Sequence, residues 1–400
     1  MGVTDDAAAI FDEIAGLRHA IHAEPEVGLD LPLTQQKVLA ALDGLPLEVS
    51  TGTALTSVTA VLRGTGNPGG PVVLLRGDMD ALPVTERTGL DYASTHDGAM
   101  HACGHDLHTA MLAGAARLLS ARRRDLAGSV VFMFQPGEEG YAGARYMIEE
   151  GVLDAAGERP AAAYALHVAS AQLPIGMFST RPGTIMAAAE VLDVTVHGHG
   201  GHGSQPHHAA DPIPATCEIV LALQALVTRK FDIFDPVVIT VGSLHAGTAD
   251  NVIPDSAHFL ATVRSFSPAS RERVRDAALG LVRDIAAAHG LTVTAEFTNS
   301  YPVTVNDQAE AQFAVDVVAD VLGEGRHVGL HNPMAGAEDF SYVLEQVPGA
   351  FVMLGACPHG TDPATAPFNH SAEARFDDAV LADGAALYAE LALRRLSAVE

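Results

Sequence analysis

The sequence predicts an α/β protein in which a main domain with a mostly parallel central sheet is interrupted by a smaller inserted domain. Short apolar runs alternate with helical periodicity from Val61 to His167, which is typical of strand–helix units in a parallel sheet. The order of the elements then changes between about 187 and 299. A chain of 400 residues also exceeds what one hydrophobic core usually serves, so two domains are expected.

Three buried strands are expected in the first part of the chain, and polar groups follow directly after each of them. The strands are 72–75, 130–134 and 162–166, and the groups that follow are Arg76 to Asp80, Glu138 with Glu139, and His167. Ligands bind beyond the carboxyl ends of strands in open α/β sheets, so these side chains are expected at one rim. Helical spacing of apolar residues from Leu107 to Leu119 places Cys103 and His105 at the start of a helix.

The inserted segment has its own order of elements. Strands are expected at 191–196, 237–244, 258–263 and 291–297, with helices at 211–230 and 270–289. This β-α-β-β-α-β order is typical of a ferredoxin-like unit, in which two helices cover one face of a four-stranded sheet. The inserted domain is therefore predicted at 187–299, and the main domain at 1–186 and 300–400. The second part of the main domain is expected to hold a helix at 307–322, a strand at 350–354 and a closing helix at 377–396.

Charge and composition exclude several classes of function. The chain carries 23 basic and 49 acidic residues, and its formal charge of -26 repels nucleic acids and anionic membrane surfaces. Three widely spaced cysteines, Cys103, Cys217 and Cys357, argue against a disulfide framework and favour a reducing compartment. The first 17 residues lack basic side chains and an apolar core, and no apolar run has the length of a membrane span. We therefore expect a cytoplasmic protein.

The stretch from Met100 to His108 holds three imidazoles, a thiol and a carboxylate within nine residues. Its Cys103 and His105 can both be metal ligands, because metal binding holds cysteine as a thiolate and histidine as a neutral imidazole. His167 and His370 follow later strands and extend this ligand set. The alternative interpretation is a polar turn with an incidental buried thiol.

Acidic residues after two of the strands suit the chemistry of a metal site. One of Glu138 and Glu139 can coordinate a cation, and the other can accept a proton from an activated water. The alternative is a solvated acidic turn. Asp78 and Asp80 can orient ligand imidazoles from behind, or they can cap the next turn.

Several long motifs in collinear order resemble those of a known family. They are Arg76-Gly-Asp-Met-Asp-Ala-Leu-Pro83, His101-Ala-Cys-Gly-His-Asp-Leu-His108, Gln135-Pro-Gly-Glu-Glu-Gly140, Leu166-His167 and Ala337-Glu-Asp-Phe340, preceded by Arg18-His19 and His22-Ala-Glu-Pro-Glu26. Together they resemble metal-dependent N-acyl-amino-acid amidohydrolases, the branch of hippurate hydrolases and auxin-conjugate hydrolases. This branch belongs to the aminoacylase and carboxypeptidase family of two-metal peptidases. The resemblance spans nearly the whole chain and implies a two-metal exopeptidase-like fold with an inserted lid and dimerisation domain.

The resemblance also implies roles for individual residues of the main domain. Two divalent ions, zinc, manganese, cobalt or nickel, would be bound by Cys103, His105, Glu139, His167 and His370. Glu138 would be the general base and acid, and Asp80 would orient a ligand. Asp78 stands where the wider family has a metal-binding histidine, and Cys103 would compensate for that change. The division of ligands between the two ions stays open, as do the roles of Glu338 and Asp339.

Three residues of the inserted domain receive roles from the same resemblance. His202, in a glycine-rich turn that continues to Ser204, would stabilise the tetrahedral oxyanion, often from the partner subunit of a dimer. Asn251 and Arg264 would contact the carboxylate end of the substrate, a task that suits the planar guanidinium of arginine. The alternatives are a flexible metal-scavenging loop, a turn asparagine and a surface strand arginine.

The sequence therefore predicts metal-dependent hydrolysis of the amide bond of small N-acyl amino acids, which releases a carboxylic acid and a free amino acid. A homodimer formed through the inserted domain is expected from the resemblance. Three alternatives remain: a dipeptidase or carboxypeptidase that uses the same site, a non-catalytic metal-binding homologue, and thiol catalysis by Cys103. The acyl group, the amino acid and the physiological metal are not determined by the sequence.

Overall fold

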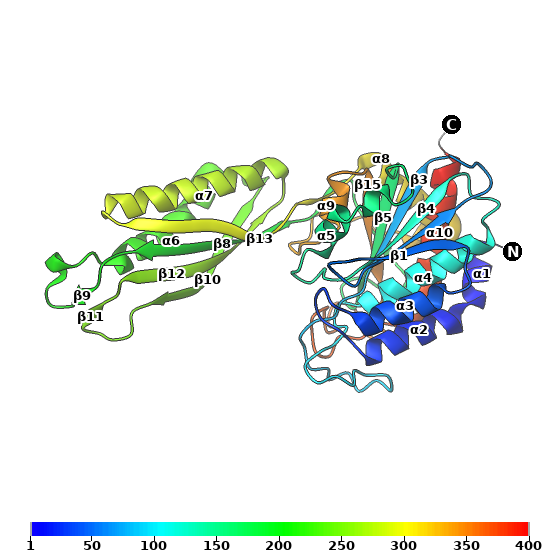
Figure 1. Cartoon of the computed structure of the whole chain (residues 1–400), viewed down its shortest axis with the longest axis horizontal. Coiled ribbons are helices and arrows are strands. Elements are labelled where there is room, and N and C mark those ends of the chain that lie inside the picture. Colours follow the sequence, from blue (N-terminus) through cyan, green and yellow to red (C-terminus); the bar gives the residue numbers. More distant parts are fainter. Residues whose placement is uncertain (1, 399–400) are drawn as a thin grey trace. The chain divides into compact units, whose positions relative to one another are not determined.

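A computed structural model describes residues 2–398, except for the side chains of residues 299 and 300. The chain divides into two compact units (Figure 1). The first comprises Met1–Ile185, Val305–Asn332 and Asp339–Glu400, and the second comprises Met186–Thr304 and Pro333–Glu338. The predicted insertion at 187–299 lies inside the second unit. The sequence did not indicate that 333–338 also belongs there. This segment lies beside the start of the second unit because Ala187 N–H donates to the carbonyls of Met334 and Gly336, each at 3.0 Å.

The first unit is built on a seven-stranded sheet with the order β1-β2-β4-β3-β5-β15-β6. Its strands are β1 (Leu47–Thr51), β2 (Val58–Arg63), β3 (Val72–Asp78), β4 (Ser129–Gln135), β5 (Ala162–Ala169), β6 (Phe178–Ser179) and β15 (Gly349–Gly355). The four inner strands are parallel to one another, whereas β1, β2 and β6 join antiparallel. The sheet is therefore mixed, and the predicted parallel arrangement applies to its centre.

Helices cover both faces of this sheet. They include α1 (Val3–Ala9), α2 (Phe11–Ala23), α3 (Pro32–Leu42), α4 (His105–Ala121), α8 (Gln308–Leu322) and α10 (Leu381–Ser397). Helices α4 and α10 pack against each other and against β3, and α1 and α2 pack against this pair. The short helices α5 (Gly143–Glu149) and α9 (Ser341–Leu344) pack together on the opposite side of the sheet (Figure 1). Every residue of β3 is buried, so its carboxyl end delivers side chains into the interior.

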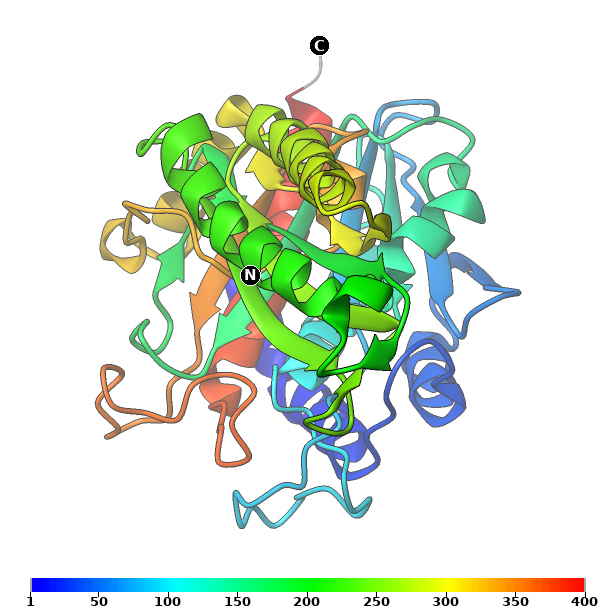
Figure 2. The ribbon, with the colours of Figure 1, turned by 90° about the vertical axis from the view of Figure 1, so that its left-hand side faces the viewer.

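The second unit has the predicted strand–helix–strand–strand–helix–strand order. Its elements are β8 (Ala188–His197), α6 (Pro212–Lys230), β10 (Val237–Ala246), β12 (Ser256–Ser265), α7 (Pro268–Ala288) and β13 (Thr292–Tyr301). The four strands form an antiparallel sheet with the order β10-β12-β8-β13. Burial alternates along β8, and α6 and α7 lie side by side over the buried face (Figure 2). The side chains of Asp211 and Ser267 cap the two helices.

Short elements complete the chain. β9 (Gly201–His202) pairs with β11 (Val252–Ile253), and β7 (Gly183–Met186) pairs with β14 (Thr304–Asn306). Single 3-10 turns occur at Val152–Asp154, Pro206–His208, Glu324–Arg326 and Asp378–Val380. Among the described residues, no helix combines the length and the apolar character needed to cross a membrane.

Candidate metal centre

The inner strands β3 and β5 separate near their carboxyl ends. Their backbone ladder ends at the pair Arg76 and Ala165. Beyond this pair the Tyr388 hydroxyl lies between the strands, where it accepts the Leu166 N–H at 2.8 Å and donates to the Arg76 carbonyl at 2.6 Å. The buried side chain of His108 bridges the next gap. The strands therefore diverge at the rim where ligands bind in α/β sheets.

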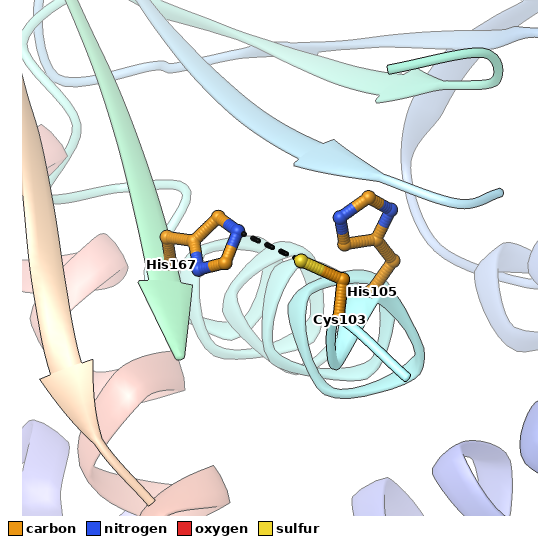
Figure 3. Close-up of side chains that lie close together, drawn as sticks. All are labelled: Cys103, His105 and His167. Carbon is orange, nitrogen blue, oxygen red and sulfur yellow. Dashed lines mark hydrogen bonds between the residues drawn. The ribbon is translucent and has the colours of Figure 1, made fainter. Parts of the chain in front are cut away.

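Cys103, His105 and His167 come together at this rim (Figure 3). Cys103 and His105 flank Gly104, the residue before α4, and Cys103 Sγ lies 3.5 Å from His167 Nε2. His167 Nδ1 donates to the Val168 carbonyl at 2.9 Å, which turns Nε2 toward the thiol. The sequence placed His167 after a strand, but it lies inside β5, because β5 continues to pair with β15 as far as Ala169.

Glu139 and His370 extend this cluster. Glu139 Oε1 lies 3.2 Å from His370 Nε2 and 3.9 Å from His105 Nε2. The potential ligand atoms of Cys103, Glu139 and His370 lie within 4.8 Å of one another, as do those of His105, Glu138 and Glu139. The five predicted ligands and Glu138 thus form overlapping groups that share Cys103, His105 and Glu139.

Asp80 holds the turn that carries the two glutamates. Its carboxylate accepts the backbone N–H of Glu138 at 2.9 Å and that of Glu139 at 3.0 Å. The same carboxylate lies 3.4 Å from His105 Nδ1. Asp80 therefore connects the glutamate turn with the imidazole of a predicted ligand.

The donor set fits divalent cations. Donor atoms about 2.1–2.3 Å from a tetrahedral ion lie roughly 3.4–3.8 Å apart, close to the 3.5 Å between Cys103 Sγ and His167 Nε2. His105 is completely buried, yet neither of its ring nitrogens has a hydrogen-bond partner among the described residues. Buried polar atoms in native proteins nearly always have partners. Bound cations would supply the missing partners.

The electrostatics of the cluster also favour cations. Burial alone would lower the pKa of His105, but the charge of Asp78 and the proximity of Asp80 raise it well above its usual range. Hydrogen bonds to Cys103 and Glu139 raise the pKa of His370 to about 10. Both shifts show that the surrounding thiol and carboxylates stabilise positive charge at this position.

Asp78 and His108 are committed to hydrogen bonds with protein groups. His108 Nδ1 donates to Asp78 Oδ1 at 2.6 Å, and His108 Nε2 accepts the Val168 N–H at 2.8 Å. Arg76 Nη1 donates to Asp78 Oδ2 at 2.5 Å. Burial opposes the charge of Asp78, but Arg76 and the neighbouring imidazoles lower its pKa well below the usual range. Asp78 therefore anchors His108, which in turn holds the peptide group next to His167. Sequence reasoning gave His108 no role, although it lies three residues after His105 on the same helix.

Asp339 links three elements of the first unit. Its carboxylate accepts hydrogen bonds from Arg76 Nη2 at 3.0 Å, from Gln135 Nε2 at 2.8 Å and from the Ala144 N–H at 2.9 Å. Burial raises its pKa to about 6, although Arg76 opposes this shift. Asp339 therefore joins β3, β4 and the start of α5, a role that the sequence left unassigned. Glu338 belongs to the second unit.

His202, Asn251 and Arg264 all belong to the second unit. His202 is exposed in β9, opposite Val252 of β11, and its Nδ1 accepts the Ser204 N–H at 3.1 Å. The neighbouring Gly203 N–H donates to the Asn251 carbonyl at 2.8 Å, so His202 and Asn251 lie on adjoining turns. Arg264 lies at the other end of the sheet, since it is opposite Ala189, whereas Ser256 is opposite His197. Eight residues of strand separate the two ends by roughly 25 Å, so one copy of this unit does not bring Asn251 and Arg264 together.

The chain is similar to several known proteins. A family model described as peptidase family M20/M25/M40 matches residues 74–394. The chain is 37% identical over 390 residues to an IAA-amino acid hydrolase, ILR1-like 4, of Arabidopsis thaliana, covering 96% of this chain and 86% of that protein. It is 37% identical to thermostable carboxypeptidase 2 of Saccharolobus solfataricus over 98% of this chain and 97% of that one. It is 34% identical to an N-acetylcysteine deacetylase of Bacillus subtilis over 98% and 99% of the two chains.

A solved structure is similar over almost the whole chain. It is the Bacillus subtilis YXEP protein, described as a dinuclear metal-binding peptidase from the M20 family. The TM-score is 0.82 with 31% sequence identity, and the match covers 98% of this chain and 100% of that one.

Proposed function

This chain belongs to peptidase family M20/M25/M40, and from that premise we propose that it hydrolyses the amide bond of N-acyl amino acids. The observation that carries the proposal is the cluster of predicted ligands, in which Cys103 and His105 are buried, with the buried carboxylate of Glu138 beside it. The cations would be held by Cys103, His105, Glu139, His167 and His370. When bound, divalent cations polarise a carbonyl and lower the pKa of water.

Glu138 is the proposed proton carrier. Its side chain is buried, and its carboxylate lies within 4.8 Å of ligand atoms of His105 and Glu139. It would accept the proton of the attacking water and later deliver it to the departing amino acid nitrogen. Asp80 would keep Glu138 in place through the backbone hydrogen bonds of the turn.

The substrate class is supported by two relatives. The names of the Arabidopsis and Bacillus proteins describe hydrolysis of an IAA-amino acid and deacetylation of N-acetylcysteine. Both substrates are small, and each holds an amino acid in amide linkage. The free carboxylate of such a substrate needs local positive charge in a chain with a formal charge of -26. Arg264 is the proposed partner, because its guanidinium is half-buried and has a planar fork.

Within this proposal, His202 and Asn251 act from a second copy of the chain. Within their own unit they lie near the Ser256 end of β12, and the strand from Ser256 to Arg264 spans roughly 25 Å, which is too far for one small substrate to reach both. A homodimer formed through the second unit would supply the pair from a partner. His202 would then donate to the oxyanion of the reacting carbonyl.

A carboxypeptidase is the second candidate, because a relative with that name is as similar as the plant hydrolase. The two candidate activities would use the same site. They differ in the group that supplies the carbonyl of the cleaved bond, which is a simple acyl group in one and an amino acid residue in the other. Cleavage of dipeptides in preference to N-acyl amino acids would favour the carboxypeptidase.

The test compares N-acetyl, N-benzoyl and longer-chain acyl amino acids with free dipeptides, using full-length protein refilled with single metals. Wild type is expected to prefer the N-acyl substrates. The substitution Glu138→Gln should lower kcat by about 10²–10⁴-fold, because it removes the proton acceptor, while the bound metal content stays unchanged. The matched control is Glu149→Gln, an exposed glutamate of α5, which should retain full activity.

Three results would contradict the proposal. A wild type that cleaves none of these substrates with any metal indicates a binding protein. An active Glu138→Gln variant would show that Glu138 is not the proton carrier. Inactivation by thiol alkylation that metal saturation does not prevent indicates catalysis by Cys103.

A further inference from the structure

Asn369 contacts the segments that carry three of the predicted ligands. Its Nδ2 donates to the Val168 carbonyl at 3.0 Å and to the Cys103 carbonyl at 3.3 Å, and it lies 3.7 Å from Cys103 Sγ. Its Oδ1 accepts the Ser170 N–H at 2.9 Å and the Ser170 hydroxyl at 3.0 Å. Asn369 itself directly precedes His370. One side-chain amide therefore joins the loop of Cys103, the end of β5 and the loop of His370.

The His370 loop depends on such contacts because it has little packing of its own. It belongs to the long connection between β15 and the turn at Asp378–Val380. The His370 side chain is 55% exposed, and its neighbour Phe368 is 50% exposed. His370 also has a left-handed backbone, with φ of 74°, which is uncommon outside glycine. The His370 N–H donates to the Ala102 carbonyl at 2.8 Å. The backbone of His370 and the side chain of Asn369 therefore both bind the loop that carries Cys103.

The Val168 carbonyl is the point where two of these contacts meet. It accepts His167 Nδ1 at 2.9 Å and Asn369 Nδ2 at 3.0 Å, which uses both of its lone pairs. The first bond directs His167 Nε2 toward the thiol, and the second brings the amide to the same thiol. Groups that hydrogen-bond to a metal ligand without binding the metal fix the orientation of that ligand. Their loss commonly lowers metal affinity by about 10–100-fold.

We infer that Asn369 is a positioning residue that aligns Cys103, His167 and His370 and donates a hydrogen bond to the ligand sulfur. This inference rests on the metal site of the proposed function. Asn369 need not touch the substrate or the reacting atoms. Its effect would be on how tightly a cation binds and on the geometry of the bond to Cys103.

The test removes the N–H donor of the Asn369 side chain and keeps the shape of that side chain. Asn369→Asp retains an acceptor oxygen for Ser170 but cannot donate to Val168 or Cys103. The matched control is Asn332→Asp, which makes the same change of charge at an exposed position of the first unit. A second control, Ser170→Ala, retains every Nδ2 contact. The probe is Co²⁺ added to metal-free full-length protein, with the thiolate-to-cobalt charge-transfer absorption and competition by a chelator as readouts.

We expect Asn369→Asp to bind Co²⁺ about 10–100-fold more weakly than wild type, with a shifted or weakened charge-transfer band. The two control variants should resemble wild type. Unchanged affinity and an unchanged band in Asn369→Asp would overturn the inference and leave the proposed metal site intact. A wild type without any thiolate band would overturn the ligand role of Cys103 and, with it, both proposals.

A variant that fails to fold would still leave a decisive measurement. Far-ultraviolet circular dichroism of the metal-free variant would reveal such a failure. The crystal structure of Co²⁺-loaded wild type then decides. Asn369 Nδ2 within hydrogen-bond distance of both Cys103 Sγ and the Val168 carbonyl supports the inference, and an amide turned away from them overturns it.

Discussion

A buried ionic network lies directly behind His105. Asp106, the next residue, accepts hydrogen bonds from Arg18 Nε at 2.9 Å and His22 Nδ1 at 2.8 Å. His22 Nε2 lies 3.2 Å from Glu86 Oε1. Burial alone would lower the pKa of His22, but the charge of Asp106 and the hydrogen bonds to Asp106 and Glu86 together outweigh burial and raise the pKa to about 9. His22 is therefore charged at neutral pH and pairs α2 with the first turn of α4.

This network predicts a pH-dependent contribution to stability. The unfolded pKa of histidine is about 6.5, so the stabilisation from His22 is fully present below pH 6.5 and is lost as the pH rises through about 9. The shift corresponds to about 3 kcal/mol, or roughly 5–10 °C in Tm for a unit of this size. Thermal unfolding of metal-free wild type and His22→Gln between pH 6 and pH 10 measures it. The Tm difference between them should shrink as the pH rises.

The control is His331→Gln, which removes an exposed histidine of the same unit. Its Tm should follow that of wild type at every pH. A constant gap between wild type and His22→Gln over this range would mean that His22 does not carry the proposed charge.

Sequence reasoning was strongest for side chains that follow strands. The predicted ligands from Cys103 to His370 come together near the rim where the inner parallel strands end. It could not assign partners to polar groups such as the buried His108 and the partly buried Asn369. His108 binds Asp78 and the Val168 N–H. Asn369 binds Cys103 and Ser170. These pairs are 30 to 266 positions apart, so only tertiary packing identifies them.

At the scale of elements, the sequence predicted the inner strands and the two long helices of the second unit, but gave no elements before residue 61. The reason is visible in α2, whose inward face includes Arg18 and His22 beside apolar residues. These buried polar side chains interrupt the apolar periodicity that indicates a helix. Strand β1 was missed because it is an edge strand with four exposed residues.

The start of α4 is the element on which the ligand positions depend most directly. Gly104 has φ of 82°, a left-handed conformation that favours glycine. A Cβ atom at this position would lie 2.3 Å from Val168 Cγ2 and 3.1 Å from Phe376 Cε1. Both neighbours are buried, and Val168 is already fixed by His108 and Asn369. Gly104 therefore allows Cys103 and His105 to approach the end of β5 closely.

We expect Gly104→Ala to destabilise the protein by roughly 2–4 kcal/mol, since it combines left-handed strain with an overpacked contact. It should also weaken metal binding, because Cys103 and His105 flank the displaced residue. The matched control is Gly98→Ala, where φ is 80° but a Cβ atom would meet nothing within 4 Å. That variant should lose only about 1 kcal/mol and bind metal normally. Thermal unfolding and chelator competition measure both effects, and equal losses in the two variants would contradict the steric argument.

At the scale of the whole molecule, the sequence predicted two units but not the return of 333–338 to the second one. This segment joins through backbone hydrogen bonds from Ala187, which leave no pattern in the side chains. The second unit also separates Asn251 from Arg264, although the sequence predicted that both contact the carboxylate end of the substrate. His202 and Asn251 lie on adjoining turns, and Arg264 lies at the far end of β12. The spacing follows from the length of the strand, which a list of motifs does not reveal.

This separation leads to a prediction about assembly. If His202 acts on the site of a partner subunit, a complete site combines Glu138 of one copy with His202 of another. The homodimers of Glu138→Gln and His202→Ala should each be nearly inactive. Co-expressed at equal levels under different affinity tags, the two variants form heterodimers in which one of the two sites is intact. The whole mixture should therefore recover about a quarter of wild-type kcat, because about half of the dimers are mixed.

The control is co-expression of Glu138→Gln with His105→Ala, which places both substitutions in the first unit and should restore nothing. Light scattering on each preparation establishes that dimers are present, and circular dichroism establishes that His202→Ala is folded. If His202 serves its own subunit, every site in the mixed dimer carries one defect and activity stays at the level of the single variants. Recovery in the heterodimer thus requires that the two turns carrying His202 and Asn251 reach across the subunit boundary, and its absence would place both residues in the same copy as Glu138.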